Sequence, residues 1–409
     1  MIERGAKLTQ QEFPVTHARR TLLTSLVIVG IGFSVYFPLL APIGREIGFS
    51  EFQITSIIGV SALIVFLVSP FWGRLSDTWG RKRVMLIGLF GYTGGTLIFT
   101  IVLAIGLEGW LLGIPLYLAL IGARILHAIF MSAAMPASTA YMADITNVEN
   151  RTKGMGASGA ANNIGSMVGP VFAGLAAISL LLPLWLMAII AFINGLFVWR
   201  YLPEPPRHAV PQHRPRRLKY TDPRILPFVV VGVCMFMGFA LVQQTMGFRF
   251  QDALGLSATD TAKTLGIAMM LSAACSLFSQ MVIVQRLRLA PFTLLRIAIP
   301  LLIVAFVLMS AFSTQLMLTI AMMILGLGMG IAGPGFMSGA SLAVSAEEQG
   351  AVAGVAGSCP PLGFFIGPML GGALYQVNPV LPYQFAAGMY VLLVIAMIFL
   401  ARRVTVHEG

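Results

Sequence analysis

Residues 165–174 read GSMVGPVFAG and residues 363–372 read GFFIGPMLGG. These are two copies of the pattern GxxxGPxxGG, with Ala173 replacing one glycine in the first copy. Each copy lies in a long apolar segment, and Pro136 and Pro334 precede the two copies at matching distances. Because two parts of one chain repeat this pattern, the sequence predicts a membrane protein with two similar halves. Secondary transporters commonly have this plan and bind substrate between the halves.

Composition supports a membrane protein. Of the 409 residues, 57% are hydrophobic and 10% charged, and the mean hydropathy is +0.88. A helix needs about 20 apolar residues to cross a bilayer, and the sequence contains twelve such segments. They cover approximately residues 21–43, 54–75, 84–105, 114–140, 156–178, 183–201, 225–248, 261–284, 291–312, 315–341, 350–375 and 381–402.

Basic residues predict the orientation and the division of the chain. With the N-terminus inside, all 26 Lys and Arg residues lie on the inner side except four, as expected from the positive-inside rule. The exceptions are Arg45, Arg124, Arg249 and Lys263. Residues 201–224 form a basic, Pro-rich segment that cannot continue a helix. We therefore expect a six-helix half at 1–200, a cytoplasmic linker at 201–224, a second six-helix half at 225–409, and two cytoplasmic termini.

The loop between the second and third predicted spans points to a family. Residues 73–83 read GRLSDTWGRKR, which resembles the signature GxLaDrxGrkx of the major facilitator superfamily at nearly every fixed position. Gly73 and Gly80 permit close approach and a tight turn. Asp77 among basic residues can form an ion pair that stabilises one access state. A solvated positive loop explains the basic residues, but not the spacing of the aspartate and glycines.

The resemblance extends along the whole chain. Residues 144–154, DITNVENRTKG, are similar to the matching loop of this superfamily, and their charges either join the first loop in one cluster or are unrelated surface charges. GxxxGPxxGG on span five is typical of the drug and proton antiporter branch, where glycines flatten one helix face and proline bends the helix. The resemblance implies an all-α membrane protein with the major facilitator fold, twelve transmembrane helices and two pseudo-symmetric six-helix halves.

The same motifs suggest residues with gating roles. They are Gly73, Asp77, Gly80, Arg81, Asp144, Arg151, Gly165, Gly169, Pro170, Gly174, Gly363, Gly367, Pro368 and Gly371.

Span four carries the main candidate for a polar site. Arg124 matches the buried arginine of the branch's span-four motif, but His127 and Ala128 replace its usual glutamine and glycine. Arg124 and His127 share one helix face, and a charge inside the membrane indicates function by default. Alternatively, Arg124 binds backbone carbonyls and His127 is a neutral core residue. The expected substrate-binding residues are Arg124, His127, Arg249, Gln243, Gln244, Tyr36, Asn162 and Asn163, of which the neutral ones can equally join helix to helix.

The charge inventory narrows the expected cargo. All 15 acidic residues lie in loops or near span ends, whereas exporters of lipophilic cations usually need a carboxylate inside the membrane. Arginine instead suits carboxylate and phosphate. We therefore expect proton-coupled export of an anionic or zwitterionic metabolite, such as a carboxylate siderophore. A multidrug or antibiotic efflux pump and a proton-symport importer of an organic anion remain alternatives. Candidate proton-coupling residues are His127, Asp77 and Asp144.

Other classes of function lack support in the sequence. It contains no HExxH, GxSxG or nucleotide-binding loop, so we expect no enzyme, no cofactor and no metal. The net charge of +11 is spread over the predicted inner loops, which favours contact with anionic lipid over nucleic acid. We expect a multi-pass protein of the bacterial inner membrane that acts as a monomer, with a small-molecule substrate, protons and membrane lipid as its partners.

Overall fold

The computed structural model describes residues 15–146, 148–205, 218–287, 289–345 and 348–406, and leaves the side chains of residues 148–149, 151–153 and 397–406 undescribed. Every element within these ranges is a helix. The first part of the chain forms α1 (Val15–Ser34), α2 (Phe37–Glu46), α3 (Glu51–Trp79), α4 (Arg81–Leu107), α5 (Gly113–Met131), α6 (Ala134–Asp144), α7 (Val148–Val168), η1 (Gly169–Ala177) and α8 (Leu182–Tyr201). The second part forms α9 (Leu226–Leu254), α10 (Ala258–Phe278), η2 (Ser279–Val284), α11 (Gln285–Leu287), α12 (Pro291–Ala311), α13 (Gln315–Leu342), α14 (Gln349–Val377) and α15 (Leu381–Val406).

Ten helices in the described ranges are long and apolar enough to cross a membrane, against twelve predicted spans. The two predicted spans that are not among these ten helices are the fifth and the twelfth. Span five is α7, which is rich in glycine and polar residues, followed by the 3₁₀ helix η1. Span twelve is α15, whose described side chains end at Ala396, so that only the part Leu381–Ala396 is described as an apolar helix. Spans one and four are each two consecutive helices, and Pro38 and Pro136 lie just after the breaks, where a missing N–H costs least.

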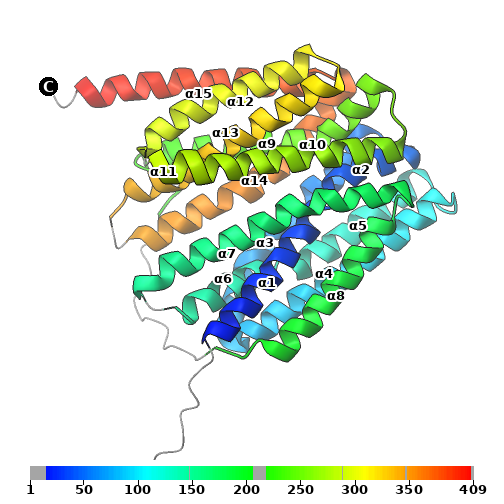
Figure 1. The fold of residues 1–409 in the computed structure, drawn as a ribbon, viewed down its shortest axis with the longest axis horizontal. Coiled ribbons are helices and arrows are strands. Elements are labelled where there is room, and N and C mark those ends of the chain that lie inside the picture. The colour runs from blue at the N-terminus through cyan, green and yellow to red at the C-terminus, as the bar shows by residue number, and fades with distance from the viewer. Residues whose placement is uncertain (1–14, 147, 206–217, 288, 346–347, 407–409) are drawn as a thin grey trace, which may run out of the picture.

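The helices gather in two bundles. Figure 1 shows α1 and α3 to α8 on one side and α9 to α15 on the other, with the start of α1 and the end of α15 toward the same end of the molecule. One hydrophobic core lies almost entirely in the second bundle, between Ile225 and Leu393. Two further cores lie in the first bundle. The boundaries at residues 200 and 225 stay a prediction, and residues 206–217 of the linker lie outside the described part.

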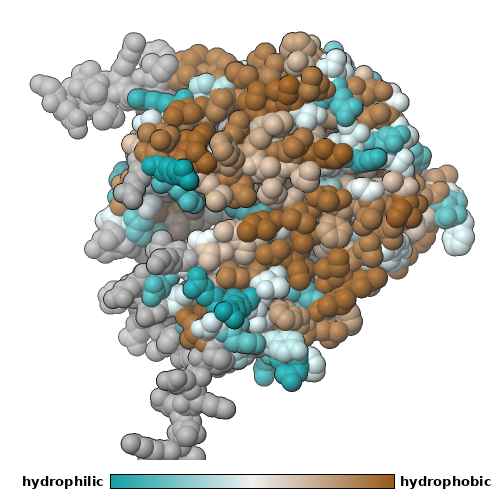
Figure 2. All heavy atoms as spheres, in the orientation of Figure 1, coloured by the Kyte–Doolittle hydropathy of each residue, from teal (hydrophilic) through white to brown (hydrophobic). Residues whose placement is uncertain are grey.

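The outer surface has the pattern of a protein in lipid. Figure 2 shows hydrophobic residues across the flank of both bundles and hydrophilic residues mainly toward the two ends. Large apolar side chains remain exposed on this protein, including Leu67, Phe192 and Leu392. Apolar surface on this scale suits contact with acyl chains rather than water. The protein is a multi-pass membrane protein.

The two bundles meet closely at one end, here called the closed end, where α2 and α9 finish and α3 begins. Gly372 of α14 lies so near α3 that an added Cβ would be 2.0 Å from Thr55 Oγ1. Gly247 of α9 likewise has no room for a Cβ beside Ala41 of α2. At the opposite end, here called the open end, Gly156 and Gly354 have no atom within 4 Å of that position. The bundles are therefore in close contact at the closed end, whereas these two glycines at the open end have no neighbouring atom within that distance.

A charged contact holds the second bundle together at the open end. Arg224, just before α9, donates to Glu348 Oε2 at 2.8 Å and to Asp222 Oδ2 at 2.8 Å. The hydrogen bonds to Asp222 and Glu348 raise the pKa of Arg224, so this exposed guanidinium stays cationic. The contact joins the start of α9 to the segment that leads into α14.

Candidate functional site

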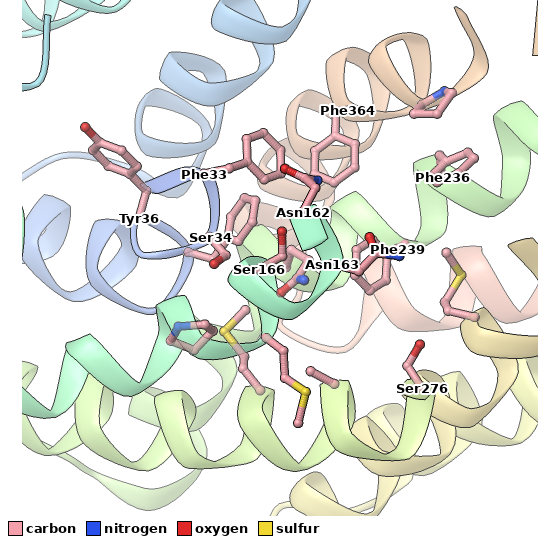
Figure 3. A pocket seen from close by; sticks show the side chains of 18 of the residues that line it. Phe33, Ser34, Tyr36, Asn162, Asn163, Ser166, Phe236, Phe239, Ser276 and Phe364 are labelled. Atoms are coloured by element: carbon pink, nitrogen blue, oxygen red, sulfur yellow. The ribbon is translucent and has the colours of Figure 1, made fainter. Parts of the chain in front are cut away.

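A central cavity of about 840 Å³ lies between the bundles. This volume falls in the range of small-molecule sites, roughly 300 to 1,000 Å³. Helices of both bundles line it, and Figure 3 shows side chains from several of them turned toward a common space. Its labelled lining residues are Phe33, Ser34, Tyr36, Asn162, Asn163, Ser166, Phe236, Phe239, Ser276 and Phe364.

The first bundle contributes an arginine–histidine pair to the cavity wall. Arg124 and His127 of α5 are 7% and 1% exposed, and Arg124 Nη1 lies 2.9 Å from His127 Nδ1. Arginine is always a donor, so Nδ1 accepts this bond and the neutral imidazole carries its proton on Nε2. Arg124 Nε and His127 Nε2 have no hydrogen-bond partner among the described residues. The pair thus offers two buried, unsatisfied donors, which suit an oxygen acceptor.

Aromatic rings hold this pair in place. The Arg124 guanidinium carbon lies 4.8 Å from the Tyr36 ring centroid and 5.3 Å from the Phe99 ring centroid, distances typical of cation–π contacts. The Tyr92 ring lies edge-on to the His127 imidazole at 4.9 Å. Because these contacts come from α1–α2 and α4, neighbouring helices of the first bundle fix the orientation of the α5 pair.

A glycine lets α5 approach α4 at this point. A Cβ on Gly95 would lie 2.6 Å from His127 Cβ, so a larger residue there would displace the imidazole. Tyr36 and Thr96 share a hydrogen bond of 2.9 Å beside it. The packing of α4 against α5 therefore determines how far Arg124 and His127 lie from the cavity.

An aromatic cluster joins the two bundles across the cavity. Phe33 lies 5.4 Å from Phe37 and 5.9 Å from Phe364, measured between ring centroids. Phe239 lies 6.2 Å from Phe364. Several methionines complete the apolar lining, namely Met131, Met135, Met167, Met269, Met322, Met329 and Met337. The cavity thus combines a small cationic region with a large, adaptable apolar one.

The other residues expected to bind substrate divide into two groups. Tyr36, Asn162, Asn163 and Gln243 line the cavity with Arg124 and His127. Arg249 does not: its guanidinium donates to Phe312 O and Ser313 Oγ at 3.0 Å, just past the end of α12. Gln244 is 3% exposed and also lies outside the lining. The structure therefore gives no support to a substrate contact for Arg249 or Gln244.

Acidic side chains are absent from the described lining of the cavity. The described residues also contain no group of three or more His, Cys, Asp or Glu side chains arranged to hold a metal. Within this part of the chain, the positive charge of Arg124 has no carboxylate beside it in the cavity wall.

The predicted charge cluster near the open end is present within the first bundle. Arg81 pairs with Asp77 at 2.5 Å and with Asp144 at 2.8 Å, and also donates to Ser76. Gly80, with φ of 106°, makes the turn between α3 and α4 that brings Arg81 to this position. The side chain of Arg151 lies outside the described part. The gating role of this cluster stays a prediction.

The sequence reasoning missed a second charged cluster at the closed end. Arg45 of α2 contacts Asp252 of α9 and Glu51 of α3. Tyr375 of α14 donates to Asp252 Oδ2 at 2.7 Å. The available signal was that Arg45 and Asp252 both lie at span ends on the side that otherwise carries few charges.

A family model described as Major Facilitator Superfamily matches residues 22–360. The chain is 27% identical to Multidrug resistance protein 2 of Bacillus subtilis (strain 168), over 89% of this chain and 90% of the relative. It is 25% identical to Multidrug resistance protein 1 of the same strain, over 89% and 91%.

A solved structure shows the same fold. It is a bacterial homologue of the human lysosomal transporter Spinster, in an inward-facing and occupied conformation. It matches with a TM-score of 0.73 and 16% identity, over 95% of this chain and 97% of that chain. The predicted all-helical major facilitator fold is thereby confirmed apart from the count of twelve spans, and the chain belongs to the Major Facilitator Superfamily and is a membrane transporter, not an enzyme.

Proposed function

We propose that this transporter exports a small organic anion or zwitterion, such as a carboxylate siderophore, across the bacterial inner membrane by proton-coupled alternating access. One observation supports this class of cargo. Arg124 and His127 line a cavity whose described residues include no carboxylate, and two of their donor nitrogens, both buried from solvent in this state, have no hydrogen-bond partner among the described residues. A carboxylate cargo would supply both the missing acceptors and the missing negative charge.

The positive-inside rule supports an inward-facing state. The loops at the open end carry most of the basic residues, among them Arg74, Arg81, Arg83 and Arg224. The open end then faces the cytoplasm together with both termini, and cargo enters the cavity from inside the cell. The helices of one chain form this cavity without a partner, which supports a monomer as the unit of transport.

His127 is the preferred proton-coupling residue of this proposal. Its Nδ1 accepts from Arg124 only while the ring is neutral. A proton bound at Nδ1 would remove this acceptor and place two cations side by side. The binding of cargo and the binding of a proton are therefore linked through the same pair. Asp77 and Asp144 stay alternative coupling residues at the open end.

A multidrug efflux pump is the second candidate. Two of the relatives are named multidrug resistance proteins. The aromatic and methionine lining would also accept apolar compounds of various shapes. In this alternative, Arg124 serves the structure of α5 and the cargo binds chiefly to the apolar wall.

Metabolites retained by a deletion strain would separate these candidates. Cells without the gene are complemented with the native protein, with Arg124→Gln or with Arg249→Gln, and metabolites inside and outside the cells are measured by mass spectrometry. Arg249 is a matched control, because it is an equally buried arginine outside the cavity lining.

We expect a carboxylate metabolite to accumulate inside the deletion strain and to be released by the native and Arg249→Gln proteins. Its export by Arg124→Gln should fall about tenfold or more, the loss expected when one charge-assisted hydrogen bond is removed. If all three proteins restore only resistance to cationic drugs, the anion proposal is wrong and the multidrug alternative holds. Purified protein of each variant is checked for a native melting temperature.

A further inference from the structure

A single arginine joins the two bundles electrostatically at the closed end. Arg45, at the end of α2, donates through Nη1 and Nη2 to the two carboxylate oxygens of Asp252, at the end of α9, over 2.5 and 2.9 Å. Such a two-point arginine–carboxylate contact is directional as well as strong. It links residues that lie on opposite sides of the linker in the sequence.

The surroundings of this ion pair are also shared between the bundles. The Arg45 guanidinium carbon lies 4.9 Å from the centroid of the Phe248 ring, which is fully buried and packs against Tyr375 at 5.4 Å. Phe248 and Tyr375, both from the second bundle, belong to a hydrophobic core made otherwise mainly of first-bundle residues. The ion pair therefore lies at the outer edge of a hydrophobic core to which both bundles contribute.

Each member of the pair has a second partner within its own bundle. Arg45 Nη2 also donates to Glu51 Oε1 of α3 at 2.7 Å. Asp252 Oδ2 also accepts from Tyr375 of α14 at 2.7 Å. Parting the bundles would thus leave Arg45 with Glu51 and Asp252 with Tyr375, so neither charge would be left without a partner. This lowers the main cost of breaking a partly buried ion pair.

We propose that Arg45 and Asp252 form the reversible lock that holds the closed end shut and must separate once in every transport cycle. This inference rests on the alternating-access part of the proposed function. The exposed fractions of the two side chains, 21% and 37%, indicate a contact that water screens in part. Such a pair can favour one state without trapping the protein in it.

A distance measurement across the closed end tests the lock without any cargo. Spin labels are attached at Glu108→Cys, after α4, and at Val377→Cys, at the end of α14, in a chain whose native Cys234, Cys275 and Cys359 are replaced by alanine. Pulsed electron spin resonance on the protein in lipid nanodiscs then gives the fractions with short and long separations.

We expect Arg45→Gln and Asp252→Asn each to raise the ratio of long to short separations about twofold to fivefold. The exchanged double variant Arg45→Asp with Asp252→Arg, made in a Glu51→Gln background so that the new aspartate does not face a carboxylate, should recover most of the short separation. Asp260→Asn is the matched control, because Asp260 lies near the same end and its side chain, among the described residues, is hydrogen-bonded only to Ser257 at the start of its own helix. It should leave the ratio unchanged.

Unchanged ratios in both single variants would overturn the lock, as would a double variant no more closed than the single ones. Neither result would bear on cargo or on proton coupling, which the metabolite experiment tests separately. Conversely, loss of anion export in Arg124→Gln would leave the lock untouched.

Discussion

At the scale of single residues, the tautomer of His127 decides what the site can do. Nδ1 accepts from Arg124, so the neutral ring has only Nε2–H left to donate. A glutamine at this position can still accept through its amide oxygen, but it cannot take up a proton. We expect His127→Gln to retain cargo binding and downhill exchange, and to lose uphill transport driven by a pH gradient.

Reconstituted vesicles would check this prediction, with and without an imposed pH gradient. The control is His127→Leu, which removes the acceptor as well and should weaken cargo binding about fivefold to tenfold. Uphill transport by His127→Gln would show that coupling lies elsewhere, with Asp77 and Asp144 as the next residues to test.

At the scale of elements, the glycines of the first GxxxGPxxGG copy differ in what they do. A Cβ on Gly165 would lie 1.9 Å from the carbonyl oxygen of Val27 in α1. Gly174 has no atom within 4 Å. We therefore expect Gly165→Ala to force α7 away from α1 and to destabilise the protein by about 1–3 kcal/mol, while Gly174→Ala has little effect.

Thermal unfolding of the detergent-solubilised variants, followed by the loss of monodisperse protein, would measure this difference. Equal melting temperatures for Gly165→Ala and Gly174→Ala would contradict the close packing of α1 and α7. In the second copy, Gly363 likewise faces a neighbouring backbone, that of Phe236 and Met237.

At the scale of the whole molecule, α3 and α14 run antiparallel and part toward the open end. Thr55 faces Gly372 and Gly59 faces Met369 at the closed end. Extending this register places Gly73 opposite Gly354, both of which have room for a side chain in this state. Closure of the open end should bring these two positions together, which explains why a small residue begins the first loop motif.

We expect Gly73→Cys with Gly354→Cys to form a disulfide under mild oxidation and to stop transport until it is reduced. Gly122→Cys with Gly354→Cys is the control, since Gly122 lies on α5 in open space. After proteolytic cleavage of the linker, the mobility of the protein on a gel shows directly whether the disulfide joins the two halves. Transport that continues with the cross-link complete would contradict closure of the bundles along α3 and α14.

Local composition alone was enough to predict much of this protein. The apolar segments, the repeated glycine–proline pattern and the basic loops gave the helical membrane fold, and the helix period placed Arg124 and His127 on one face. These properties depend on residues close together in the chain, because every helix in lipid must satisfy its own backbone and present an apolar surface.

Tertiary structure decided the rest. It turned Arg249 toward the end of α12 and away from the cavity, and it joined Arg45 to Asp252. It also made the two similar motifs different, since residues 169–177 form a 3₁₀ helix beside α10 whereas residues 363–372 stay α-helical against α9 and α3. Such outcomes depend on how helices far apart in the sequence rotate and pack, and no local pattern encodes that arrangement.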